Sequence, residues 1–217
     1  MTYADEPDAF PFRGDAVLHG IARTSCRGHM IYLTATPDAQ LKKMTAEGKI
    51  TCFKLNRRPH GHDLPVPQIR CGPLLYRLMV LLTWLRKQKD HPRMIFVPTI
   101  RMAETMHLFL GIFTKCSVCT SKTADRDAVI GRFRSEKAGV IVCTTVLERG
   151  VTVENVSVAV YQAQHRVFDE AGLVQMAGRA GRSFRYPDGD VLFLTGEKSR
   201  LAQECRKQIE EANLCAV

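Results

Sequence analysis

Two arginines near the carboxyl end of the chain have the side chains best suited to phosphate chemistry. Arg179 and Arg182 lie in the segment 175–182, which reads Gln-Met-Ala-Gly-Arg-Ala-Gly-Arg. A guanidinium group is planar and permanently charged, and it matches two phosphate oxygens at once. The small residues between the arginines let the backbone approach another surface closely. With Gln175, this segment predicts a site where an arginine stabilises the charge on a phosphate group during its transfer.

Hydroxyl groups follow several apolar runs of the sequence. These residues are Thr34 and Thr36, Thr99, and Thr144 and Thr145. At Thr99, Thr144 and Thr145, hydroxyls and backbone amides at a strand end suit a nucleic-acid phosphate. Thr34 and Thr36 could instead hydrogen-bond the acidic run near the amino end. Thr36 and Thr99 could also cap the helices that follow them, and the two uses are compatible.

Adjacent carboxylates near the amino end add a third kind of chemistry. Asp5 and Glu6 open the run Asp-Glu-Pro-Asp. In nucleotide hydrolases, an Asp after a strand holds Mg²⁺ and the next Glu polarises the attacking water. No strand is predicted before Asp5, so a solvated acidic segment is the alternative.

Short apolar runs alternate with amphipathic stretches along most of the sequence. Strands are predicted at 30–33, 50–55, 94–97, 116–119, 140–143, 156–161 and 191–194. Helices are predicted at 39–47, 74–89, 102–110, 126–134, 169–176 and 198–212. Repeated strand–helix units imply an α/β fold with a mainly parallel sheet and helices on both faces. Ligands of such folds bind at the carboxyl ends of the strands, where the threonines fall.

The composition favours an ordinary α/β protein with a polyanionic partner. The net charge is +9 over 217 residues, which moderately supports nucleic acid as that partner. No stretch approaches the roughly 20 apolar residues that span a bilayer, and the amino end lacks signal-peptide features. Of eight cysteines, only Cys116 and Cys119 have metal-ligand spacing. Because no second pair completes a tetrahedral site, we expect a strand there and no zinc.

The order of these motifs resembles motifs II to VI of superfamily-2 helicases. Short stretches of the sequence narrow the resemblance to ComFA-like competence proteins. This resemblance covers nearly the whole chain. The segments that carry it are 5–12, 32–37, 60–67, 147–152 and 165–168, the last leading into the arginine segment. ComFA-like proteins are described as ATP-driven motors that help to pull single-stranded DNA into the cytoplasm during transformation.

The resemblance implies a role for each candidate residue. Asp5 would bind Mg²⁺ through ATP, and Glu6 would activate water. Thr34 and Thr36 would couple two RecA-like lobes. Contacts to DNA phosphates would come from Thr99, Thr144 and Thr145. The ATP phosphates would be faced by Gly150, Gln175, Arg179 and Arg182, with Arg182 as the arginine finger.

The sequence departs from the family pattern in its first part. It contains no Gly-x-x-x-x-Gly-Lys-Ser/Thr phosphate loop and no four-cysteine zinc module. We therefore expect residues 1–58 to be a truncated remnant of the first lobe, 59–73 a linker, and 74–217 a complete second lobe. The expected partners are single-stranded DNA, a missing phosphate-loop half and, as an open possibility, membrane DNA-uptake machinery. The expected location is the cytoplasm, with the inner face of the membrane also open.

Two other functions stay open at this point. The chain could be a standalone, non-catalytic module that binds single-stranded nucleic acid. It could also be another superfamily-2 helicase, of the replication-restart or RNA type.

We expect the isolated chain neither to hydrolyse ATP nor to translocate DNA, because the phosphate loop supplies most ATP affinity. The check is a phosphate-release assay with and without single-stranded DNA. ATP turnover that disappears in Arg182→Ala would contradict this expectation.

Overall fold

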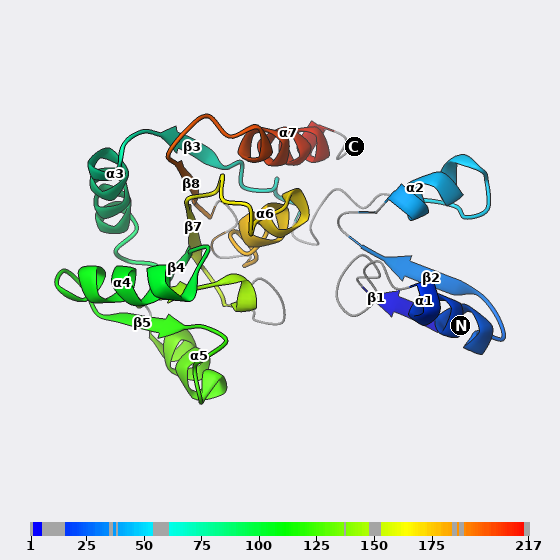
Figure 1. Cartoon of the computed structure of the whole chain (residues 1–217), viewed down its shortest axis with the longest axis horizontal. Coiled ribbons are helices and arrows are strands. Elements are labelled where there is room, and N and C mark those ends of the chain that lie inside the picture. The colour runs from blue at the N-terminus through cyan, green and yellow to red at the C-terminus, as the bar shows by residue number, and fades with distance from the viewer. Residues whose placement is uncertain are drawn as a thin grey trace. The chain divides into compact units, whose positions relative to one another are not determined.

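The chain forms two compact units, Met1–Lys54 and Leu55–Val217, and each is described by itself. The computed structural model describes residues 2–5, 16–34, 37, 39–53, 61–136, 138–147, 153–183, 186 and 189–214. Figure 1 shows the elements of both units coloured along the chain. In this described part, no helix is long and apolar enough to cross a membrane.

The second unit is built on a parallel sheet of six strands in the order β3-β8-β7-β4-β6-β5. The strands are β3 (Gln68–Cys71), β4 (Arg93–Phe96), β5 (Cys116–Cys119), β6 (Val140–Cys143), β7 (Ser157–Tyr161) and β8 (Val191–Thr195). All residues of β4, β6, β7 and β8 are buried, as near-continuous apolar runs require in a sheet covered on both faces. The predicted parallel α/β sheet is confirmed.

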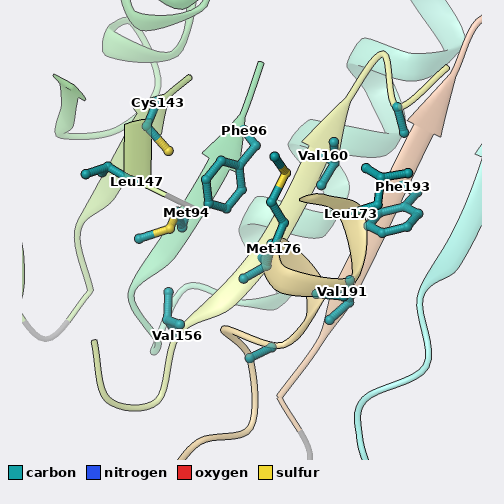
Figure 2. Packing of buried hydrophobic residues seen from close by; sticks show 14 of the residues in the cluster. Met94, Phe96, Cys143, Leu147, Val156, Val160, Leu173, Met176, Val191 and Phe193 are labelled. Carbon is teal, nitrogen blue, oxygen red and sulfur yellow. The ribbon is translucent and has the colours of Figure 1, made fainter. Parts of the chain in front are cut away.

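Helices cover both faces of this sheet. One face packs against α3 (Leu74–Lys87) and α4 (Ile100–Gly111), and the other against α5 (Arg126–Ser135), α6 (Glu170–Ala177) and α7 (Arg200–Leu214). Alternate residues of each strand serve the two faces: Met94 and Phe96 belong to the α6 side, whereas Ile95 belongs to the α3 side. Figure 2 shows the α6 side, where Leu173 and Met176 lie against the strands.

The first unit contains β1 (Thr2–Asp5), α1 (Ala16–Ser25), β2 (Met30–Leu33) and α2 (Ala39–Ala46). β1 and β2 pair in parallel, with Asp5 level with Leu33. The expectation that no strand precedes the acidic pair is therefore wrong. The Thr-Tyr-Ala run is too short to show a pattern by itself, and it becomes a strand through its pairing with β2. α1 was not predicted, and residues 51–53 of the predicted strand 50–55 form no strand.

Part of the segment predicted as a linker, 59–73, belongs to the sheet. β3 pairs with β8, with Ile69 level with Phe193. Before it, the backbone N–H of Leu64 donates to the side-chain oxygen of Asn213 (2.8 Å), and the Asn213 amide donates to the Leu64 carbonyl (2.9 Å). β3 is a largely exposed edge strand that follows prolines, which edges tolerate, so its sequence resembles a loop.

We expect limited proteolysis to leave a resistant fragment that begins before Leu64, not at Leu74. The pairing of β3 and the Leu64–Asn213 hydrogen bonds keep residues 64–71 in the folded unit. Asn213→Ala removes both bonds and should let cleavage advance toward β3. Mass spectrometry of the fragments gives the amino-terminal position. The exposed helix residue Gln203→Ala serves as the control, since it should leave the position unchanged. A fragment of the unaltered chain that begins at Leu74 would contradict the pairing of β3.

Candidate functional site

The strand register brings several hydroxyl-bearing residues to one edge of the sheet. β6 pairs with β4 and β5, so Cys143 lies level with Phe96 and with Cys119. Because the strands are parallel, the residues that follow them emerge at the same edge. Thr99 follows β4 and Thr144 follows β6, so the sequence correctly placed both after strands of one sheet.

Thr99 is exposed at the amino end of α4. Its side-chain oxygen accepts a hydrogen bond from the backbone N–H of Met102 at 3.2 Å, which makes it the N-cap. The capping use of this threonine is confirmed. Its hydroxyl hydrogen is still able to donate to a phosphate oxygen, and α4 offers the partial positive charge of a helix amino end.

Thr144 and Thr145 differ in access to a ligand. Thr144 is only 7% exposed, and its carbonyl accepts from the backbone N–H of Leu147 at 3.3 Å. Thr145 is half-buried and begins the short 3-10 turn Thr145–Leu147. Thr145 is therefore the more accessible of the pair. Gly150 lies outside the described residues.

The end of β5 adds a turn that sequence reasoning missed, in which Thr120 is only 4% exposed and Lys122 is exposed. Thr120 follows β5 as Thr144 follows β6, and its side-chain oxygen accepts from the backbone N–H of Lys122 at 3.3 Å. Its own N–H donates to the side-chain oxygen of Thr123 at 2.9 Å, which fixes a tight turn. Lys122 is exposed on this turn and brings a positive charge to the edge. The signal was available, because Thr120 directly follows a predicted strand.

The arginine segment begins on α6, which confirms the helix predicted at 169–176 within one residue. The Asp169 carboxylate caps this helix by accepting from the backbone N–H of Gly172 at 2.8 Å. Leu173 and Met176 are fully buried against the sheet, as Figure 2 shows, while Gln175 is half-buried. Gln175 therefore lies on a side of the helix that is not fully buried in the core.

The two arginines after α6 have different surroundings. Arg179 is 5% exposed, and its positive charge lies near the Cys143 thiol. Burial raises the pKa of this thiol well above its ordinary value and Cys119 raises it further, whereas the Arg179 charge acts in the opposite direction. Arg182 is exposed, and its Nε–H donates to the Gly178 carbonyl at 2.8 Å. This difference favours Arg182 as the arginine able to meet an external phosphate.

In the first unit, two candidate residues occupy the same end of a strand pair. Asp5 ends β1 level with Leu33, and Thr34 directly follows Leu33. Glu6 and Thr36, and the side chain of Asp5, lie outside the described residues. Within the described ranges, no group of three or more His, Cys, Asp or Glu side chains could hold a metal ion. The proposed magnesium role of Asp5 thus stays a prediction.

Comparisons with known proteins support the same family. The helicase conserved C-terminal domain matches residues 75–184. The competence protein ComFA of Bacillus subtilis is 31% identical over 96% of this chain, and that of Streptococcus pneumoniae is 32% identical over 98%. The chain covers 48% and 52% of these two proteins, so it spans about half the length of the curated relatives it matches.

Solved helicase structures share the fold. The chain is similar to Saccharomyces cerevisiae Dbp5 bound to RNA and ADP BeF3, with a TM-score of 0.68 at 18% identity, over 99% of this chain and 57% of that one. Mss116p bound to single-stranded RNA and AMP-PNP gives a TM-score of 0.66 at 16% identity, over 98% and 46%. The resemblance to ComFA-like proteins is confirmed, and the chain belongs to the helicase conserved C-terminal domain family.

Proposed function

We propose that this chain is the carboxyl-terminal part of an ATP-dependent motor of the ComFA type that moves single-stranded DNA in bacterial transformation. The observation that carries the proposal is the shared sheet edge, where Thr99, Thr145 and Lys122 emerge from three neighbouring strands. The match of the helicase domain and the similarity to ComFA support it.

The arginine segment would complete a nucleotide site. Arg182 is exposed and would stabilise the charge on the transferring phosphate, while Gln175 and Arg179 would bind or position the phosphates. ATP with Mg²⁺ would supply the reacting phosphate, and Asp5 and Glu6 would bind the metal and activate water. The sequence carries no phosphate loop, so these residues would act together with a loop from another half of the motor.

The sheet edge would hold the DNA backbone. Hydroxyls, backbone amides at the amino end of α4 and the Lys122 ammonium group are donors that suit phosphate oxygens. These groups contact no base in such an arrangement, so binding would depend little on sequence and strongly on salt. The net charge of +9 favours the same partner. In the cell, the motor would act in the cytoplasm, next to DNA-uptake machinery at the inner face of the membrane.

The binding of a labelled single-stranded DNA, followed by fluorescence anisotropy from low to moderate salt, tests the sheet edge. Lys122→Gln should weaken binding at low salt several-fold and reduce the salt slope by about 0.7, as expected for one phosphate contact. Thr145→Val should weaken binding without a change in slope, because it removes a neutral donor. Lys87→Gln, an exposed lysine at the carboxyl end of α3, is the matched control and should bind as the unaltered chain does.

The same measurement separates the alternatives. Equal losses in Lys87→Gln and Lys122→Gln would mean that the edge is not the binding surface. A strong preference for RNA of the same sequence would favour an RNA helicase. That class is represented among the matches by the probable ATP-dependent RNA helicase DDX17 of Homo sapiens, at 28% identity over 64% of the chain. A standalone binding module would also bind DNA. In that case no nucleotide would alter the binding, even after a phosphate-loop half is added.

A further inference from the structure

Gly189 lies directly against the backbone of the arginine segment. A Cβ atom added at Gly189 would be 2.3 Å from the backbone nitrogen of Gly181 and 3.0 Å from the carbonyl carbon of Ala180. These are backbone atoms, so no side-chain rotation could relieve the overlap. The contact therefore fixes how closely the segment before β8 packs on the turn that carries Arg182.

The residue after Gly189 anchors this contact to the rest of the fold. The Asp190 carboxylate accepts hydrogen bonds from the Gln88 amide at 2.8 Å and from the Trp84 indole N–H at 3.2 Å. Its backbone carbonyl accepts from the N–H of Val158 on β7 at 2.9 Å. Gln88 and Trp84 lie at the carboxyl end of α3 and are 6% and 7% exposed, so Asp190 is tied to buried partners.

Tyr186, which follows Arg182 in the chain, also contacts Gln88. Ser183 and Tyr186 form an isolated antiparallel bridge. The Tyr186 hydroxyl donates to the Gln88 side-chain oxygen at 3.2 Å, and its ring stacks on His91 with centroids 3.9 Å apart. Gln88 thus contacts both Tyr186 and Asp190, and Gly189, next to Asp190, lies against the arginine turn.

The turn itself depends on local geometry that a small shift would disturb. Gly181 has a φ of +64°, a conformation that favours glycine, and it precedes Arg182. The Nε–H of Arg182 reaches back to the Gly178 carbonyl. A displacement of the backbone at 180–181 would move the start of the Arg182 side chain away from that acceptor.

We propose that Gly189 is a positioning residue: its backbone supports residues 180–181 and thereby sets where the Arg182 guanidinium lies. The functional value of this position rests on the proposed role of Arg182 toward ATP. Since a misplacement of about 1 Å can lower catalytic rates by about 10²-fold, such a support would affect turnover through Arg182.

The test follows the Arg182 Nε–H resonance by ¹H–¹⁵N NMR in the full chain, assigned by its loss in Arg182→Lys. Gly189→Ala should shift this resonance and speed its exchange with water several-fold, because the added methyl group displaces the turn. Gly131→Ala, in α5 where an added Cβ meets nothing within 4 Å, is the control and should leave the resonance unchanged.

A second variant decides the matter if Gly189→Ala does not fold. Asp190→Ala loosens the anchor without adding atoms, and it should also speed exchange at Arg182. An unchanged Arg182 resonance in the folded variants would overturn the positioning role. The NMR result does not depend on ATP. If the proposed function fails, the NMR data would still place Arg182 correctly, but substitution of Arg182 would not change nucleotide turnover.

Discussion

Parallel pairing of six strands is the constraint on which the rest of the second unit depends. It sends every carboxyl end to one edge and requires a crossover connection between successive strands, so the described strand ends lead into helices or turns. Hydroxyls that follow separate strands, far apart in the sequence, thereby become neighbours. The fold itself therefore places amides, hydroxyls and the exposed Lys122 along this edge.

The core and the candidate site are linked through α6. Its apolar side packs Leu173 and Met176 on the sheet, which fixes the helix that ends at Gly178. Beyond that end, one arginine turns inward near Cys143 and the other stays exposed. The polar contacts around Gln88 then hold the following segment against the turn. The exposed Arg182 is thereby held to the end of α6 through its Nε–H bond to the Gly178 carbonyl.

The sequence predicted the buried strands well, because β4 and β6 to β8 are near-continuous apolar runs that only a covered sheet accommodates. It missed β3, whose residues are largely exposed and follow prolines, and β1, which forms only through pairing. Thr99 and Thr144 follow strands as predicted, whereas their contacts with nucleic acid stay a prediction. Residue types did not reveal that Thr144 is nearly buried, nor that Gly189 contacts Gly181, since both depend on tertiary packing rather than on a local pattern.

In the proposed function, Arg182 would act on ATP held by another half of the motor. The most direct measurement is DNA-stimulated ATP hydrolysis by a chimera that joins this chain to the part of Bacillus subtilis ComFA that it does not cover. We expect turnover in the chimera that falls by about 10³-fold or more in Arg182→Ala, while ATP binding changes little. Turnover that Arg182→Ala leaves unchanged would contradict this expectation.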